Sequence, residues 1–546
     1  MAVPAGESSL IDLEKKPVQE EPDVQEEASS SSQEGDQTEY PSTKRLLVIM
    51  GAVYLVFFIV ALNRTIIATA IPRISDDFKA LDDIGWYGSV YFITNCSTQL
   101  VFGKVYTLFS PKWVFIISIV LFEIGSAVCG AAPNSIAFIF GRAIVGIGSS
   151  AIFAGSVVII LHTIPLPKRP MYLGLLGSTF GLASVVAPLL GGAFTDKVSW
   201  RWCFYINIPI GAVTLAIVFF VLKMPNAKND TDLASAPFKK KMLHLDPFGM
   251  LCFFPGMICL LLALQWGGTT YEWNSTRIIV LLVVFALLLL GFMAIQVWNK
   301  EYASVPGRIA VQRSMLAGVY YTVCTGGHML VVLYYLPIWF QAIKGVSAVN
   351  SGINILPTMI SVVVGGIVAG GLVSKIGYYT PFMILSTVFS SIGAGLMITF
   401  TKETGPAKWI GYQVLYGFGL GSGFQHGHIA AQTVLPKKDV PIGAALVLFA
   451  QAFGGAIFLA VGQNVFANGL AARLANIAGI DATIIADVGA TTLRNRIKSP
   501  EILGRVLDQY NGALIETFQV ALALACLSLL GGLAMEWRSV KGEKKD

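Results

Sequence analysis

Long apolar stretches alternate with short polar segments along most of this 546-residue chain. Fourteen of them are long enough to cross about 30 Å of hydrocarbon as helices. Their predicted limits are 46–70, 84–109, 113–132, 136–160, 171–195, 201–222, 246–266, 277–298, 314–340, 350–374, 380–400, 408–433, 440–466 and 512–535. The pattern therefore predicts an all-α polytopic membrane protein.

An even number of spans places both ends of the chain on one side of the membrane. The short loops on that side carry more Lys and Arg than the opposite loops, with examples at Lys112, Lys168 and Lys239. Because cytoplasmic loops are the ones enriched in Lys and Arg, we expect both termini to be cytoplasmic.

The composition supports a membrane protein and excludes several other classes. Hydrophobic residues make up 55% of the chain and charged residues only 13%, against about 25% charged in soluble domains. The net charge of +6 lies mainly in the loops between spans, so it does not indicate a nucleic-acid partner. The sequence has no HExxH motif, no paired acids on one predicted helix and no nucleophile beside a base, so we expect no enzyme, cofactor or metal site.

The predicted organisation rests on a weak internal repeat. The turn "GKVYTLFSPKWVF" (103–115) resembles "GGLVSKIGYYTPF" (370–382) eight spans later, which suggests two homologous halves with two helices between them. The predicted parts are an acidic disordered cytoplasmic tail (1–44), a six-helix half (45–222), a basic cytoplasmic linker (223–245), two inserted helices (246–298), a second six-helix half with a long outer loop at 467–511 (299–536), and a cytoplasmic tail (537–546). The outer sequon at Asn274 is a predicted glycosylation site.

Several motifs give the chain a family resemblance. "LNRTIIATAIPRISDDF" begins at Leu62, "GRAIVGIGSS" at Gly141, "GSTFGLASVVAPLLGG" at Gly177 and "SWRWCFYINIPIGA" at Ser199, and "MEWRSVKG" closes the last span. Together they resemble the fourteen-helix drug:proton antiporter branch of the major facilitator superfamily, and within it fungal toxin efflux pumps. The resemblance implies two six-helix halves plus two extra helices, and proton-driven export of an amphipathic toxin, secondary metabolite or drug. We expect a monomer in the plasma membrane, with a vacuolar or vesicle membrane as the alternative.

The resemblance also assigns roles to small and charged residues. The fifth span fills the slots of the antiporter motif, which implies a bend that seals one side of the path, although packing alone would use the same residues: Gly174, Ala183, Ala187, Pro188, Gly191 and Gly192. Arg142 occupies a position tied to proton exchange, with a structural anchor as the alternative. Glu123 is a second candidate for proton coupling, because an acid inside a membrane is costly unless it serves a function or is packed in neutral form.

Polar residues at helical spacing in the apolar spans are candidates to line a substrate cavity. They are Asn63, Asn95, Gln99, Tyr321, His328, Gln425, His428, Gln432 and Gln451. Amides, histidines and aromatic rings would suit a bulky, mostly uncharged amphipathic molecule. Hydrogen bonds between helices are the alternative role for each of these residues.

The first span departs from the family pattern in a way that bears on mechanism. Asn63 stands where the family usually has an aspartate that carries protons, and Arg64 follows it. We expect Asn63 and Arg142 to lie at similar depth on antiparallel helices, so that Arg142 is hydrogen-bonded but not neutralised. Two alternatives to efflux stay open, which are a carrier of basic amino acids or another small solute and a non-transporting sensor.

Overall fold

The computed structural model describes residues 41–80, 83–223, 244–268, 270–475 and 499–541, and regular structure in these ranges is helical apart from two isolated β-bridges. The predicted tail up to residue 40, the linker between 224 and 243 and the loop between 476 and 498 lie outside the described residues. Twelve described helical segments are long and apolar enough to cross a membrane. The two predicted spans outside this set are 84–109, which carries Asn95, Gln99 and Lys104, and 408–433, which is interrupted.

The first half of the bundle follows the predicted spans closely. Its helices are α1 (Thr43–Phe78), α2 (Ile84–Leu108), α3 (Pro111–Ala131), α4 (Ser135–Thr163), α5 (Arg169–Lys197), α6 (Trp202–Tyr205) and α7 (Asn207–Val221), with a 3-10 turn η2 (Leu166–Lys168) before α5. The Asn134 side chain caps α4 by accepting a hydrogen bond from the Ala137 amide at 2.9 Å. The predicted span 201–222 divides into α6 and α7, because Pro209 cannot donate a backbone hydrogen bond to Tyr205.

The second half contains two helices of 35 residues, α18 and α21, which are nearly as long as α1 of the first half with 36. Its elements are η3 (Lys300–Tyr302), α11 (Gly307–Ala310), α12 (Arg313–Ala342), α13 (Ala348–Asn354), α14 (Leu356–Ile376), α15 (Thr380–Met397), α16 (Pro406–Gly423), α17 (His426–Val434), α18 (Val440–Leu474) and α21 (Pro500–Ala534). The prediction of one continuous helix over 408–433 is wrong, because the helix is broken after Gly423 and Gln425 leaves helical geometry at φ −98° and ψ 0°.

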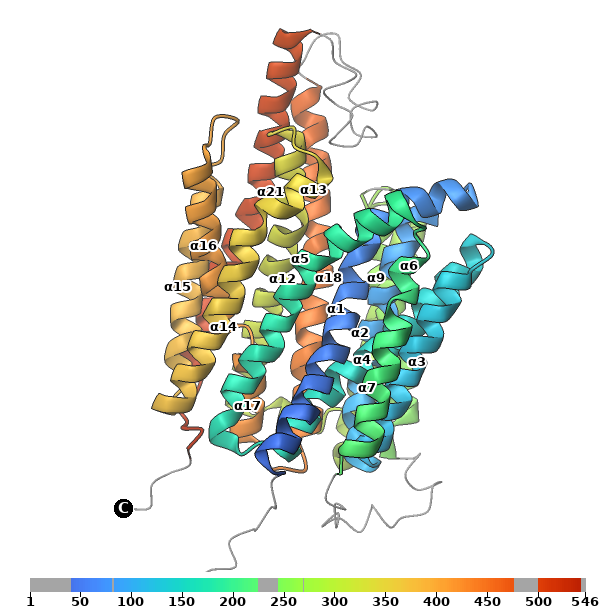
Figure 1. Ribbon diagram of the computed structural model, residues 1–546, viewed down its shortest axis with the longest axis vertical. Helices are drawn as coiled ribbons and strands as arrows, with labels where there is room; N and C mark the ends of the chain where they lie inside the picture. The colour runs from blue at the N-terminus through green and yellow to red at the C-terminus, as the bar shows by residue number, and fades with distance from the viewer. Residues whose placement is uncertain (1–40, 81–82, 224–243, 269, 476–498, 542–546) are drawn as a thin grey trace, which may run out of the picture. The chain divides into compact units, whose positions relative to one another are not determined.

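Two predicted boundaries in this half also change. The helices α18 and α21 extend into both ends of the segment 467–511, which was predicted to be a loop. Residues 500–511 carry an amphipathic pattern and simply continue the last span outward, as the tall red and orange helices show in Figure 1.

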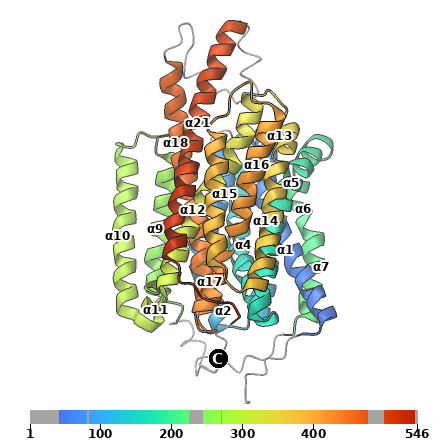
Figure 2. The same ribbon diagram turned by 90° about the vertical axis from the view of Figure 1, so that its left-hand side faces the viewer.

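The two inserted helices, α9 (Pro247–Trp266) and α10 (Thr276–Asn299), pack against each other, and α9 also contacts α2 and α18. The helix α10 stands at the edge of the bundle (Figure 2) and exposes large apolar side chains such as Leu287, at 64%, and Val297, at 78%. Only 11% of its most apolar 18-residue stretch is buried by the rest of the protein, so lipid must cover most of this helix.

A buried carboxylate joins the base of the inserted pair to the second half. Asp246 is 1% exposed and has a left-handed backbone at φ 54°. Its Oδ1 accepts hydrogen bonds from the Gly249 amide at 3.0 Å and Asn299 Nδ2 at 2.9 Å. Its Oδ2 accepts from Gln296 Nε2 at 2.6 Å, the Ser304 amide at 3.0 Å and Ser304 Oγ at 2.8 Å. One side chain therefore fixes the start of α9 against the end of α10.

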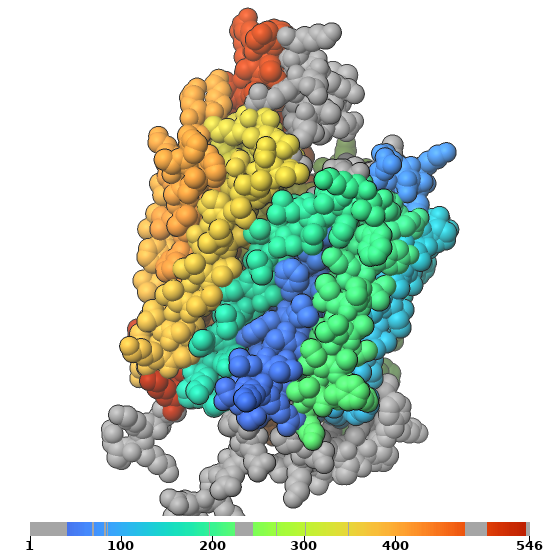
Figure 3. Space-filling model, viewed as in Figure 1, coloured from blue at the N-terminus to red at the C-terminus, as the bar shows by residue number. Residues whose placement is uncertain are grey.

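The bundle's halves meet along two pairs of helices. The helix α5 packs against α14, and α2 packs against α18. In Figure 3 the green surface of α5 lies directly against the yellow surface of α13 and α14.

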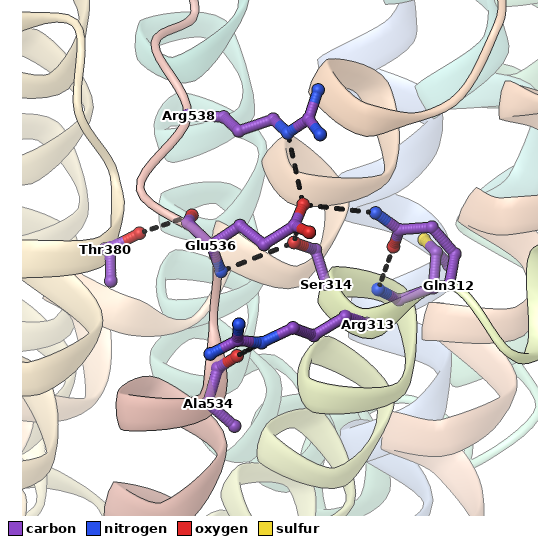
Figure 4. Close-up of polar contacts among 8 residues, drawn as sticks. Gln312, Arg313, Ser314, Thr380, Ala534, Glu536 and Arg538 are labelled. Carbon is purple, nitrogen blue, oxygen red and sulfur yellow. Dashed lines mark hydrogen bonds and ion pairs between the residues drawn. The ribbon is translucent and has the colours of Figure 1, made fainter.

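Residues 535–541 form a strap that ties α21 to the starts of α12 and α15, although residues from 537 onward were predicted to be a free tail (Figure 4). The Glu536 Oε2 atom accepts hydrogen bonds from Ser314 Oγ at 2.9 Å, Gln312 Nε2 at 3.3 Å and Arg538 Nε at 3.1 Å. Val540 is 1% exposed, and its amide donates to the Gly377 carbonyl at 2.8 Å. We call the end of the bundle where the strap lies the strap end.

The nearby pair of Arg308 and Asp439 reinforces the same end. The Arg308 guanidinium donates from Nε to Oδ2 at 3.1 Å and from Nη2 to Oδ1 at 2.8 Å. This bidentate bond raises the pKa of Arg308. It fastens α11 to the connection between α17 and α18.

Replacing Glu536 with alanine is expected to lower the stability of the purified protein by about 1–3 kcal/mol, because the buried Ser314 hydroxyl and the half-buried Gln312 amide at the start of α12 lose a charged acceptor. The measurement is the midpoint of thermal unfolding in detergent at one fixed heating rate. The matched control is Glu501→Ala, because Glu501 is exposed and its ion pair with Arg505 lies on the surface of one helix turn. Equal midpoints for the two variants would show that the strap contributes nothing to stability.

Candidate functional site

A cavity of about 50 Å³ lies between the halves. The helices α1, α2, α4 and α5 line it from the first half, and α12, α17, α18 and the α16–α17 break line it from the second. Pockets for drug-sized ligands usually measure about 300–1,000 Å³. The halves must therefore part before a molecule of that size can enter.

The polar part of the lining consists of six side chains contributed by both halves: Arg64, Asn95, Gln99, Gln425, His428 and Gln451. Asn95 and Gln99 share one face of α2 because they are one turn apart, as the sequence predicted. The break between α16 and α17 places Gln425 in the lining, and His428 follows on the first turn of α17. Five predicted cavity residues therefore gather at one place, and their contact with a substrate stays a prediction.

Four phenylalanines supply the aromatic part of the lining, and none was singled out in the sequence: Phe57, Phe153, Phe180 and Phe424. The rings of Phe57 and Phe153 lie 4.9 Å apart. A phenylalanine in an apolar span carries no signal of its own, since most such residues face lipid or another helix.

Tyr321 and His328 lie outside this lining. The Tyr321 hydroxyl donates to Ser386 Oγ at 3.0 Å, and His328 Nδ1 lies 2.8 Å from the Tyr416 hydroxyl. Both residues thus make the interhelical hydrogen bonds that were the alternative prediction. Gln432 is also outside the lining, and its buried amide atoms have no hydrogen-bond partner among the described residues.

Asn63 also points away from the cavity, toward Arg142. The Arg142 Nη1 atom donates to Asn63 Oδ1 at 2.7 Å, and its Nε donates to the Tyr87 carbonyl at 3.0 Å. The guanidinium also lies 4.8 Å from the centre of the Tyr91 ring. Both Asn63 and Arg142 are fully buried, and no carboxylate of the described residues bonds this cation. The predicted pairing of Asn63 with Arg142 is confirmed.

Arg64 lines the cavity although it was not among the predicted site residues. Neighbours on an α-helix point about 100° apart, so when Asn63 faces α4 its neighbour faces the cavity. The Arg64 guanidinium lies over the rings of Phe92, at 4.7 Å, and Phe180, at 5.5 Å. The signal was present in the sequence as an amide and a cation side by side within an apolar span.

Glu123 lies elsewhere in the first half. Its carboxylate faces Gly211 of α7, where any larger side chain would overlap it. Both carboxylate oxygens are buried without a hydrogen-bond partner in the described residues. The structure therefore does not bring Glu123 to the cavity lining or into contact with Arg142, the other candidate for proton coupling.

The small residues of α5 divide into two groups along the helix. Near the strap end, a methyl group on Gly174 would overlap the carbonyl oxygen of Gly366 on α14. Further along, Ala183 and Ala187 are fully buried. The helix continues through Pro188.

Toward the opposite end, contacts between α5 and α13 are looser. A methyl group on Gly352 would meet Pro188 Cβ at 3.4 Å, and one on Gly192 would meet Val349 at 4.0 Å. Gly191 is buried, and its carbonyl accepts a hydrogen bond from Thr195 Oγ1 at 2.5 Å.

Two further glycines bring the halves into backbone contact near the strap end. A methyl group on Gly370 of α14 would lie 2.6 Å from the Pro170 carbonyl oxygen. One on Gly103 of α2 would lie 2.6 Å from Ala445 Cβ of α18. At both places the helices approach too closely to admit even a methyl group, and only glycine permits such contact. These contacts close the cavity toward the strap end.

Asn274 lies in an exposed turn between α9 and α10, at the end of the bundle opposite the strap. The next residue, Ser275, is the N-cap of α10. The asparagine is accessible, and its glycosylation stays a prediction.

Comparisons with known proteins agree on one family. The model of the Major Facilitator Superfamily matches residues 53–303. "MFS-type efflux pump MFS1" of Trichophyton rubrum is 54% identical over 501 residues, which cover 92% of this chain and 93% of that protein. "Efflux pump aflT" of Aspergillus parasiticus is 49% identical over 502 residues, which cover 92% and 97%.

Solved structures share the fold at low identity. The proton:xylose symporter XylE matches with a TM-score of 0.55 at 13% identity, over 89% of this chain and 95% of that one. A bacterial homologue of the lysosomal transporter Spinster matches with a TM-score of 0.57 at 14% identity, over 91% and 98%.

Proposed function

Because this chain belongs to the major facilitator superfamily and its relatives are efflux transporters, we propose that it exports an amphipathic toxin, secondary metabolite or drug in exchange for protons. The observation that carries the proposal is the cavity between the halves, which combines amides, a histidine, a cation and four phenyl rings. Such a lining suits a molecule with both apolar and polar parts.

The proposal includes a fourteen-helix topology of the drug:proton antiporter branch. All fourteen predicted apolar runs contain helix, and α9 with α10 would be the two extra spans. Both termini and the strap end would face the cytoplasm, and the monomer would work in the plasma membrane, without a cofactor or a nucleic-acid partner.

Export would proceed by rocking of the two halves around the cavity. The glycine contacts of α5 with α14 and of α2 with α18 would separate to admit substrate from the cytoplasm. They would form again when the cavity opens toward the opposite end. The glycine contacts at the strap end would correspond to the stage after substrate has entered.

The other candidates are less consistent with the cavity. A carrier of basic amino acids needs acidic residues to neutralise its cargo, whereas the only ionised side chain in the described lining is Arg64. A non-transporting sensor would not need a cavity that closes by backbone contacts between halves.

Flux measurements with the purified protein in proteoliposomes test the proposal. A pH gradient is imposed, and the movement of a panel of aromatic metabolites and fluorescent dyes is followed, with empty liposomes as the control. We expect movement of some compounds that a protonophore abolishes. The absence of gradient-dependent movement for the whole panel would contradict proton-coupled export.

The Asn63→Asp variant addresses the coupling mechanism. An aspartate at this position would place a titratable carboxylate beside Arg142, where the chain now has an amide at 2.7 Å. We expect the dependence of the export rate on external pH to become steeper, up to about tenfold per pH unit for a single added titration. The measurement is the initial rate of flux across a series of external pH values.

Asn464→Asp is the matched control for that experiment. Asn464 lies on α18 outside the cavity lining, where its Oδ1 accepts a hydrogen bond from Trp273 Nε1 at 3.1 Å. If the Asn63→Asp profile equals that of the wild type, position 63 plays no part in coupling, and Glu123 becomes the first acid to replace.

A further inference from the structure

Arg64 introduces a charge into the cavity that nothing in the described part of the chain neutralises. Among the described residues of the lining it is the only permanently ionised side chain. Its contacts are the faces of Phe92 and Phe180, and it makes no ion pair or hydrogen bond with the described residues. A guanidinium keeps its charge under all physiological conditions.

Arg142, the second cation of this region, does not bring a negative partner to Arg64. Arg142 lies on the other side of Asn63, and its guanidinium is bonded to an amide and a carbonyl instead of a carboxylate. Its Nη2 has no partner at all among the described residues. Arg142 is thus buried in the first half and Arg64 faces the cavity, and neither has an acid beside it in the part of the chain that the structure describes, so Arg64 places an unpaired positive charge in the cavity.

An unpaired cation away from water is costly, and such residues inside a membrane protein usually serve a function. The rings over which Arg64 lies hold it in place but do not remove its charge. The guanidinium has five N–H donors in a planar fork that matches a carboxylate. An anion in the cavity would therefore complete a site that is electrostatically unfinished in the free protein.

The remaining lining residues indicate the body of such a ligand. Four phenylalanines line the space, and aromatic side chains suit a flat aromatic framework. Asn95, Gln99, Gln425 and Gln451 offer amide groups for hydroxyls or carbonyls on that framework. His428 adds a ring whose Nδ1 has no partner within the described residues.

We propose that the transported substrate is an aromatic molecule in its anionic form, with a carboxylate or an ionised phenol bound by Arg64. This inference rests on the proposed export function and makes its substrate class more specific. It replaces the mostly uncharged molecule that the sequence predicted, because the sequence did not show that Arg64 faces the cavity while Asn63 turns away from it.

Matched acid and amide probes test the proposal. Anthracene-9-carboxylic acid and its primary amide have the same fluorescent ring system and differ in the charge of one group. Binding of each is measured by fluorescence anisotropy with the full-length protein in neutral lipid nanodiscs, without a gradient. We expect the wild type to bind the acid at least about tenfold more tightly than the amide.

Substitutions of Arg64 then locate the origin of the preference. Arg64→Gln is expected to lose about tenfold or more in affinity for the acid while keeping its affinity for the amide. Arg64→Lys keeps the charge and is expected to retain part of the preference. Arg505→Gln, which removes an exposed arginine near the start of α21 and outside the cavity lining, is expected to behave as the wild type. Size-exclusion profiles and thermal midpoints identify any variant that does not fold. If Arg64→Gln does not fold, the preference of Arg64→Lys for the acid is compared with that of the wild type.

Three outcomes would overturn the inference. They are equal binding of acid and amide, binding of neither probe, and a preference for the acid that survives in Arg64→Gln.

The same pair of probes in proteoliposomes separates this inference from the export function. Binding of the acid through Arg64 without movement across the membrane would refute export and leave the anionic site standing. Movement of neutral compounds with no preference for the acid would support export and refute the anionic site.

Discussion

Replacing Gly174 with alanine is expected to reduce export about tenfold or more. The added methyl group would overlap the carbonyl oxygen of Gly366, where α5 and α14 are in tight contact. Overpacking of this kind costs about 1–3 kcal/mol, and it acts on the state in which the halves touch at the strap end. A transport cycle that must pass through this state then slows by the fraction of molecules that no longer reach it.

Initial rates of flux in proteoliposomes at equal protein content measure this effect. Gly370→Ala is expected to act in the same way, because its methyl group would lie 2.6 Å from the Pro170 carbonyl oxygen. The matched control is Gly371→Ala on α14, where the added methyl group would have no atom of another helix within 4 Å. If Gly174→Ala exports as fast as Gly371→Ala, close contact of the halves at this end is not required for transport.

Replacing Asp246 with alanine is expected to destabilise the protein by about 3 kcal/mol or more, the largest loss of stability anticipated here. The substitution leaves donors from Gly249, Gln296, Asn299 and Ser304 without their acceptor in a buried site. It also forces alanine into a left-handed backbone at φ 54°. We expect a fall of several degrees in the midpoint of thermal unfolding in detergent.

Two further substitutions separate the causes of that loss. Asp246→Gly relieves the backbone and removes the acceptors, whereas Asp246→Asn tolerates the backbone and keeps one acceptor oxygen. The expected order of stability is therefore Asn above Gly above Ala. Asp508→Ala, which removes an exposed partner of Lys402, is the control. Unchanged stability in Asp246→Ala would show that α9 and α10 are held by packing alone.

The sequence identified several site residues through their helical spacing. Asn95 and Gln99 were predicted to share a face of α2, and both line the cavity. Gln425 and His428 were expected on one continuous helix, but Gln425 lies in the break after α16 and His428 on the first turn of α17, and both line the cavity. The spacing of polar residues along the chain is a local property. The break lies where Gly421 and Gly423 pack tightly against neighbouring helices, which the spacing does not show.

Other residues show where spacing fails. Asn63 and Arg64 are adjacent, and nothing in their types indicates which of them meets the cavity. The packing of α1 against α4 and α5 decides that Asn63 bonds Arg142 and that Arg64 lines the open space. Glu123 was a candidate because it is an acid inside a span, yet α3 turns it toward Gly211 of α7.

The sequence by itself determined that this chain is a helical membrane protein with a family resemblance to efflux transporters. It could do so because the cost of placing polar groups in lipid is set residue by residue along each span. Only the tertiary structure decided which polar side chains meet, which stretch of the chain becomes a strap, and that the cavity contains an unpaired cation. These features depend on how whole helices are rotated and which helices touch. A rotation of α1 by about 100°, the angle between neighbouring residues, would exchange the amide of Asn63 for the charge of Arg64 at a given position.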